Sequence, residues 1–423
     1  MLAFSSGNTR SVNAERAVLE ALELAAVAGH GPPSLVLLYA GFGHDLRRLT
    51  AALRAEHPTA LVLAVTCAGV VGRDGPGESM HDIALMGLHG EGCSVSQVEG
   101  VHGSNSYAKG VELARGLREA PLPVRMVYVL ACANAIANDR LIAGIESVLG
   151  TGVVIFGAST TDPIKGAASV QAINGRVLQQ SAVAVGIWDP SLEAQVHVSH
   201  GYVAAGEPVR VTRGRENLIL ELDGVAAWPL YLSRLGLQPG AGVADTFAIG
   251  ALAARLPSAL ARGYGNSHIL RAVTDHSPTG VLTCTTTCRE GQWLWFTVRD
   301  EAHIFSDLER MLGQMARALS GCTPVAIFHS DCLARGRRLF QRVTKEELVH
   351  RMQHPFLTDS GVPPWLGIYG AGEYAPLGGR NRLHNYTTAL TALYRRNVAV
   401  ECSERLRNAQ ETSAAPPESH PAE

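Results

Sequence analysis

The stretch SLVLLYAGFGHDLRRLTAALRAEHPTALVLAVTC, residues 34–67, indicates the class of fold. Its two ends, residues 34–40 and 60–67, are short continuous apolar runs, which are typical of strands buried on both faces. Between them, residues 44–56 have the spacing of a helix and end just before Pro58. A buried strand, a helix and a second buried strand in this order predict a layered α/β arrangement.

The alternation continues along the chain. Further strands are expected at residues 82–88, 95–101, 125–131 and 153–156, and helices at residues 12–28, 106–119 and 137–149. From about residue 165 consecutive β signals follow, with a hairpin turn indicated by Asn174 and Gly175. The last third is mixed again, with expected strands at residues 246–251 and 324–329 and helices at residues 301–320 and 344–353. We therefore expect a mixed α/β (α+β) fold of two layered α/β modules with an extended β-rich central region.

Composition restricts the classes of partner. The chain has 423 residues, enough for two or three units, and is 46% hydrophobic and 17% charged, as in globular proteins. Its net charge of −2 gives no field that favours nucleic acid. No apolar run approaches the roughly 20 residues of a membrane helix, so membrane insertion is not expected. Because the N-terminus lacks a signal-peptide pattern and the cysteines are scattered, we expect a cytoplasmic protein with reduced thiols.

Local motifs for catalysis or metal binding are weak. The turn at residues 41–45 follows a strand and opens a helix, but Leu46 stands where a dinucleotide-binding fingerprint needs its third glycine. Cys284 and Cys288 have no second pair at suitable spacing, so a zinc site is not favoured. Nothing local supports a reaction, and we do not expect an enzyme.

A polar cluster follows the apolar run at the start of WLGIYGAGEYAPLGGRNRLHNYTT, residues 365–388. After a lone carboxylate, Glu373, and a Pro-Leu-Gly-Gly corner, the cluster consists of Arg380, Asn381, Arg382, His384 and Asn385. Two guanidinium groups, an imidazole and two amides could bind a small anionic ligand. The alternative is a structural corner whose polar groups bond to nearby backbone.

A second candidate region lies at Cys332, where a buried strand ends. Arg335, Arg337 and Arg338 follow on a turn that contains Gly336. Guanidinium groups close to Cys332 are expected to lower the pKa of its thiol, and they could also hold a carboxylate. The alternative is a small buried cysteine with solvated arginines beyond it, which we favour for Arg338 but not for Arg335.

With these residues in view, the chain resembles the FIST family of paired sensory modules. Four segments carry most of the resemblance: LVLLYAGFGHDLRRLTAAL (35–53), GASTTDPIKGAASVQAINGRV (157–177), FHSDCLARGRRLF (328–340) and WLGIYGAGEYAPLGGRNRLHNYTTAL (365–390). The sequence departs from the family pattern at Val70, where an acidic residue is usual, and at the shortened glycine stretch 157–159. The expected division is an N-terminal helix region (1–30), a FIST N-like module (31–215), a FIST C-like module (216–400) and a disordered tail (408–423).

The resemblance implies a sensory, ligand-binding role in signal transduction, carried out through a partner protein or through a self-association that the ligand alters. An amino-acid-like ligand would use Arg335, Asn381, Arg382 and Glu373. One branch of the family, the NosP proteins, senses nitric oxide through haem and controls a histidine kinase; here His384 or Cys332 would supply the axial ligand, and Arg380 and Arg382 would bind the propionates. A third hypothesis makes Cys332 the nucleophile of a hydrolase or transferase.

Overall fold

The computed structural model describes residues 1–26, 29–132, 136–160, 169–336 and 340–396. The expected disordered tail, and Arg337 and Arg338, lie outside these residues. Within them the mixed α/β class predicted from the sequence is confirmed, with several mixed sheets covered by helices.

The first sheet shows the unit from which most of the molecule is built. Its elements in chain order are β1 (Ala3–Thr9), α1 (Ala14–Ala26), β2 (Pro33–Gly41), α2 (Leu46–Glu56), β3 (Leu61–Cys67), the short hairpin β4 (Val70–Gly72) and β5 (Gly75–Gly77), and β6 (Ile83–His89). In space the strands lie in the order β1-β6-β2-β3, with β2 and β3 parallel and β6 antiparallel to both neighbours. The first thirty residues thus carry an edge strand as well as the expected helix.

The same connectivity occurs twice more. The second unit consists of β7 (Cys93–Val98), α3 (Ser106–Leu117), β8 (Met126–Cys132), α4 (Asn138–Leu149), β9 (Val154–Thr160), the hairpin β10 (Gln171–Ile173) and β11 (Arg176–Leu178), and β12 (Ala182–Ile187). The third consists of β13 (Glu193–Ser199), α8 (Glu301–Ala318), β22 (Cys322–Cys332), α9 (Arg342–Gln353), β23 (Trp365–Gly370), the hairpin β24 (Gly372–Leu377) and β25 (Arg380–His384), and β26 (Thr388–Arg396). Their sheets read β7-β12-β8-β9 and β13-β26-β22-β23, so three units are present where the sequence suggested two layered modules.

Each unit gives its hairpin to a neighbouring sheet. Hairpin β4–β5 pairs with β23, hairpin β10–β11 with β3, and hairpin β24–β25 with β9, which makes the sheet of each of these three units six-stranded. The exchange is cyclic, from the first unit to the third, from the third to the second and from the second to the first. Each unit therefore needs both others to complete its sheet.

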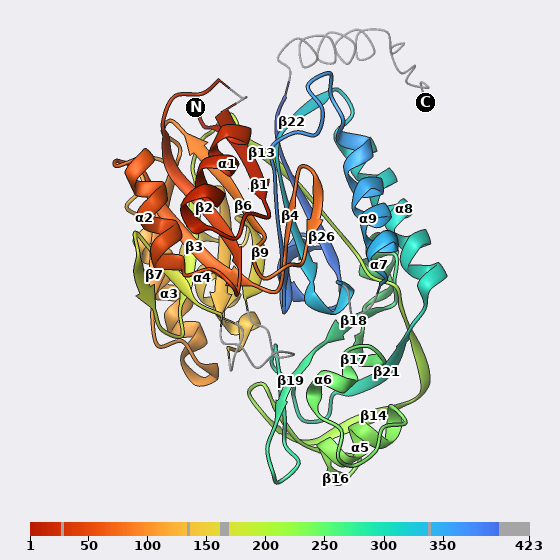
Figure 1. The fold of residues 1–423 in the computed structure, drawn as a ribbon. Coiled ribbons are helices and arrows are strands. Elements are labelled where there is room, and N and C mark those ends of the chain that lie inside the picture. The colour runs from red at the N-terminus through yellow and green to blue at the C-terminus, as the bar shows by residue number, and fades with distance from the viewer. Residues whose placement is uncertain (27–28, 133–135, 161–168, 337–339, 397–423) are drawn as a thin grey trace, which may run out of the picture.

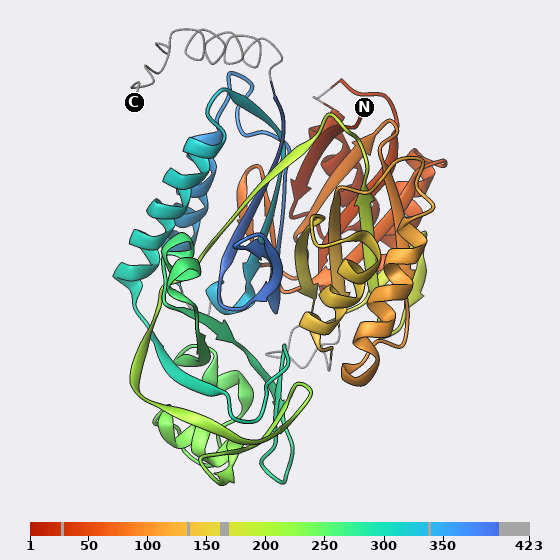
Figure 2. The ribbon, with the colours of Figure 1, turned by 180° about the vertical axis from the view of Figure 1, so that it is seen from behind.

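The three sheets share one core, and the helices lie outside them. The inner faces meet at residues from all three units, among them Leu37, Tyr128 and Phe328, and the Tyr128 and Phe328 rings lie 4.9 Å apart. On the outer faces, α1 and α2 cover the first sheet, α3 and α4 the second, and α8 and α9 the third. Figures 1 and 2 show this arrangement from its two sides.

An insertion, residues 202–299, separates β13 from α8 in the third unit. Its elements are β14 (Tyr202–Arg215), β15 (Leu218–Leu222), β16 (Val225–Ala226), α5 (Ala227–Arg234), α6 (Val243–Thr246), β17 (Gly250–Arg255), α7 (Ser258–Tyr264), β18 (His268–Arg271), β19 (Val273–His276), β20 (Leu282–Cys284) and β21 (Trp293–Arg299). They form a further sheet with its own apolar core at one end of the molecule (Figure 1). The strand expected at residues 246–251 begins only at Gly250, because residues 243–246 form a helical turn capped by Asp245.

Candidate functional site

The candidate site lies where the parallel strands β22 and β23 end, next to the turn between β25 and β26. Parallel strands bring their carboxyl ends to one edge of a sheet, which is where open α/β folds place ligands. Asp331 and Cys332 end β22, and Arg335 follows in a single helical turn. Glu373 comes from the exchanged hairpin, and Lys345 from α9.

Asp331 binds two cations at the centre of this region. Its Oδ1 accepts a hydrogen bond from Arg335 Nε at 3.1 Å, and its Oδ2 accepts one from Lys345 Nζ at 2.5 Å. Burial raises the pKa of Asp331, but the charge of Lys345, the His329 hydrogen bond and the charge of Arg335 outweigh it and hold the pKa below its usual range. All three side chains are buried, so one buried carboxylate lies between Arg335 and Lys345.

Arg335 and Glu373 each keep unused hydrogen-bonding capacity. The guanidinium of Arg335 is wholly buried, yet neither Nη1 nor Nη2 has a partner in the part of the chain that the structure describes. Glu373 Oε2 accepts hydrogen bonds from the Thr387 hydroxyl at 2.6 Å and the Thr387 amide at 3.3 Å, while Oε1 has no partner among the same residues. Buried donors and acceptors are rarely left unpaired, because each costs free energy.

The pKa of Glu373 is shifted by its surroundings. Burial raises its pKa well above the usual value, and the negative charge of Asp331 acts in the same direction. Hydrogen bonds from Thr387 and the charge of Arg335 oppose this rise without cancelling it. The folded-state pKa of Glu373 therefore lies well above that of an ordinary carboxyl group, and a positive group at Oε1 would lower it.

The expectation that arginines lower the pKa of Cys332 is wrong. Burial raises the pKa of this thiol well above its usual value, and the charges of Glu373 and Asp331 raise it further. Cys332 lies in an apolar cluster with Tyr202 and Tyr386, and only 3% of it is exposed. A protonated, covered thiol is a poor nucleophile and a poor metal ligand.

His384 is held on both ring nitrogens. Its Nε2–H donates to the carbonyl of Ala375 at 3.2 Å, so Nδ1 is the acceptor, and the hydroxyl of Tyr264 donates to it at 3.0 Å. Burial lowers the pKa of His384 to about 3, which keeps the ring neutral. The lone pair on Nδ1, which an iron would need, already accepts the hydrogen bond from Tyr264.

These two residues do not fit a haem. An axial ligand requires either a free imidazole nitrogen or a thiolate. His384 has no free nitrogen and Cys332 is a buried thiol, so neither of the expected axial ligands is available in this arrangement.

The other expected residues fall into two groups. Asn381 and Asn385 are structural, because all their side-chain amide groups bind protein atoms: Asn381 binds Glu146, Val153 and Ile155, and Asn385 binds Ala371, Ala272 and Thr285. Arg382 is half-buried and pairs across the hairpin with Ala375, and Arg380 is exposed at its turn, so neither joins the Arg335–Glu373 pair.

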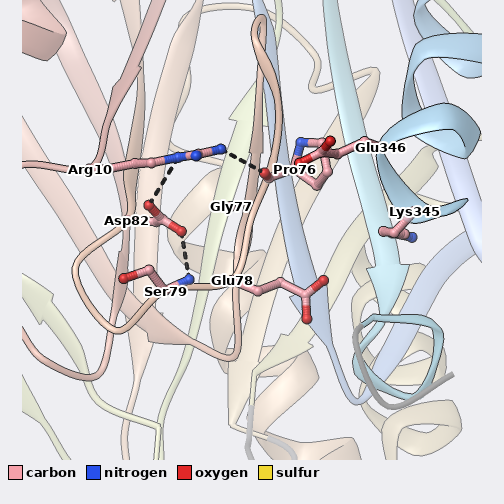
Figure 3. Close-up of a pocket in the computed structure, with 8 residues that line it drawn as sticks. All are labelled: Arg10, Pro76, Gly77, Glu78, Ser79, Asp82, Lys345 and Glu346. Atoms are coloured by element: carbon pink, nitrogen blue, oxygen red, sulfur yellow. Dashed lines mark hydrogen bonds and ion pairs between the residues drawn. The ribbon is translucent and has the colours of Figure 1, made fainter. Parts of the chain in front are cut away.

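Gly336 lies against the carboxylate of Glu78. A Cβ atom at this position would lie 2.6 Å from Oε2 of Glu78. Glu78 belongs to a small surface pocket whose lining also contains Lys345 and Glu346 from α9. In Figure 3 the Glu78 and Lys345 side chains lie on facing sides of the pocket. Burial lowers the pKa of Lys345, and the charges of Asp331 and Glu78 oppose this shift without cancelling it. Lys345 thus has the Asp331 cluster on one side and an open pocket on the other.

Sequence reasoning missed Asp331, Lys345, Thr387 and Glu78. Asp331 offered a signal, since an acidic residue at the end of an apolar strand is unusual in a core. Lys345 offered none, because it looks like an ordinary residue at the start of an amphipathic helix until β22 packs against it.

None of the helices formed by the described residues is long and apolar enough to cross a membrane. Over the same residues, no three histidine, cysteine or acidic side chains come together as metal ligands would.

Comparison with known proteins assigns the chain to a family. The FIST N domain matches residues 34–225 and the FIST C domain residues 227–376. An uncharacterized protein of Mycobacterium bovis is 28% identical over 89% of this chain and 95% of its own length, and one of Mycobacterium tuberculosis is 25% identical over 90% and 96%. The crystal structure of a cyanuric acid hydrolase from A. caulinodans aligns over 94% of this chain and 100% of its own, with 11% identity and a TM-score of 0.34. FIST domains are small-ligand sensory modules of signal transduction, and this chain belongs to the FIST family.

Proposed function

We propose that this protein is a non-enzymatic sensor for a small molecule that carries both a carboxylate and an ammonium group, as a free amino acid does. One observation carries the proposal: the unpaired Nη atoms of Arg335 and the unpaired Oε1 of Glu373 are buried and belong to groups that interact electrostatically. They offer a donor pair and an acceptor, which are the two things such a ligand requires.

The ligand carboxylate would accept from both Nη atoms of Arg335. A guanidinium presents its donors as a planar fork that matches the two oxygens of a carboxylate, and Asp331 already fixes the Nε side of that fork. The carboxylate would give the two unpaired Nη atoms of Arg335 the acceptors that they lack.

The ligand ammonium would donate to Oε1 of Glu373. Its positive charge would lower the raised pKa of this carboxyl, so binding would release a proton from Glu373. A ligand with a carboxylate alone would leave Oε1 unpaired, which is why the pair favours a zwitterion.

The bound state would be passed on through the turn between β25 and β26. Thr387, which binds Glu373, follows Tyr386, a non-glycine residue with a φ of 56°. Asn385 and His384, just before it, join this turn to the insertion. We propose that a shift of this turn alters contact with a signalling protein, such as a histidine kinase, or alters self-association.

Thermal unfolding with each of the twenty protein amino acids tests the proposal. Saturation at about 100 times the dissociation constant adds roughly 2.7 kcal/mol to the free energy of unfolding, so at least one amino acid should raise the melting temperature measurably. Glu373→Gln keeps the shape and the Thr387 contacts but cannot become a carboxylate, so it should abolish this response. Glu207→Gln, at an exposed position in β14, is the matched control and should respond as the unmodified protein does.

Two results would overturn the proposal. One is that no amino acid changes the melting temperature of the unmodified protein. The other is that Glu373→Gln responds as fully as Glu207→Gln.

A further inference from the structure

Three arginines from distant parts of the chain come together beside the candidate site. Arg271 ends β18 in the insertion, while Arg380 and Arg382 lie on β25 of the exchanged hairpin. Strand β18 packs against β25, which brings Arg271 to the side of the hairpin that carries Arg380 and Arg382. We call these residues the arginine cluster.

The three arginines of the cluster carry positive charges, and no described carboxylate forms an ion pair with any of them. Burial lowers the pKa of Arg382, and the positive charges of Arg271 and Arg380 lower it further. Glu146 opposes this effect, but its carboxylate accepts a hydrogen bond from Asn381 at 2.8 Å. Among the described residues no ion pair joins an acid to any of the three arginines.

The cluster also contains unpaired donors. The Nε atoms of Arg271 and Arg382 are buried and have no acceptor in the described part of the chain. Both residues are only half-buried as a whole, and Arg380 is exposed, so an ion from solvent can approach the rest of the cluster. Three cations, two of them with a buried free donor, and an open side together offer a site for an anion.

We propose that the arginine cluster binds a compact oxyanion with at least two negative charges, of the phosphate or phosphate monoester class. A single carboxylate would leave two of the three positive charges uncompensated. A phosphate carries close to two charges at neutral pH and has enough oxygens to accept from several guanidinium groups. The ion would tie β18 of the insertion to β25 of the hairpin.

This site is separate from the Arg335–Glu373 pair. His384 lies between them on the same face of the hairpin: it is opposite Glu373 and two residues from Arg382. His384 is neutral and fully hydrogen-bonded, so it is not a ligand of either site.

Calorimetric titration with inorganic phosphate, in a buffer whose ionic strength is held constant with chloride, tests the proposal. Glucose 6-phosphate, titrated in parallel, distinguishes a site for the free ion from one for a phosphorylated small molecule. We expect a saturable heat with at least one of the two probes. Arg271→Gln and Arg382→Gln should each weaken it roughly tenfold or more, since each removes a charge-assisted hydrogen bond.

The control is Arg262→Gln, at an exposed arginine in α7, which should bind as the unmodified protein does. Without phosphate, Arg382→Gln should melt no lower than the unmodified protein, because a half-buried charge and its repulsion from Arg271 are both removed. Glu373→Gln should keep the phosphate response, so failure here is distinguishable from failure of the amino-acid site.

The proposal is overturned if neither probe gives a saturable heat. It is also overturned if Arg271→Gln and Arg382→Gln bind as tightly as Arg262→Gln, which would leave only non-specific attraction of anions to a basic surface.

Discussion

The second and third units place polar groups at equivalent strand ends, and the two groups differ in kind. At the end of β8 and β9, Asn138 Oδ1 accepts from the hydroxyls of Ser159 at 2.9 Å and Tyr374 at 2.5 Å, and its Nδ2 donates to the Thr285 carbonyl at 3.0 Å. At the end of β22 and β23, a buried carboxylate holds two cations, and donors remain free.

The difference separates a structural network from a candidate binding site. The Asn138 network is neutral and every one of its amide groups has a partner, so it stabilises the fold and offers nothing to a ligand. The Asp331 group is charged and incomplete within the described residues, and under the proposed function a ligand would complete it. Equivalent strand ends thus hold a structural hydrogen-bond network in the second unit and a candidate site in the third.

The largest effect is expected from breaking the charged group. Asp331→Asn keeps the shape of the side chain but removes the carboxylate to which both Arg335 and Lys345 are bonded. We expect a loss of about 3–5 kcal/mol in the free energy of unfolding, measured by urea denaturation. Asp359→Asn, at an exposed position, is the control and should change stability little. A loss below about 1 kcal/mol in Asp331→Asn would mean that the two cations are not desolvated as the structure has them.

A smaller loss is expected from breaking the neutral network. Asn138→Ala removes the acceptor shared by Ser159 and Tyr374 and leaves two buried hydroxyls to find other partners. This should cost about 1–3 kcal/mol in the same denaturation measurement. The response to amino acids should be unchanged, because Asn138 has no part in the Arg335–Glu373 pair. If Asn138→Ala lost that response, the two strand ends would be functionally coupled, and the distinction between a structural network and a candidate site would be wrong.

The smallest effect is a change of stability with pH. The folded protein holds the proton of Glu373 to a higher pH than the unfolded chain does, because the folded-state pKa of this group is raised. The unfolded chain releases the proton above its ordinary pKa of about 4.3. The contribution of Glu373 to the free energy of unfolding is therefore lost as pH rises beyond that value. Glu373→Gln lacks this titration. Its stability relative to the unmodified protein should therefore rise between pH 5 and pH 6, by at most about 1 kcal/mol. Parallel stability curves over this range would show that Glu373 is ionised in the folded protein.

The local elements of the fold could be predicted from the sequence, but their assembly could not. The apolar runs 34–40, 60–67 and 125–131 are strands in the structure because a continuous apolar segment of that length fits a sheet buried on both faces. The exchanged hairpins escaped prediction, since β4 and β5 are three residues each and β4 pairs with Gly367 and Ile368, about 300 positions away. Residues 3–9, rich in serine, glycine and asparagine, become a strand only because β6 lies alongside.

Some residues of the candidate site could likewise be predicted from the sequence, and others could not. The sequence marked Cys332, Arg335 and Glu373, and the structure brings all three to one corner. It also marked Asn381 and Asn385, whose side-chain amides are bonded to protein atoms in the structure. It offered no sign of Lys345 or Arg271.

What the sequence by itself determined is the class of fold, the position of most helices and strands, the family, and two segments that hold ionisable groups near strand ends. What only the tertiary structure decided is which of those groups are buried, which are paired and which keep a free donor or acceptor. The physical reason is that periodicity and turn chemistry act over a few residues. Desolvation and charge pairing instead depend on which distant segments pack together, and here these come from different units and from the insertion.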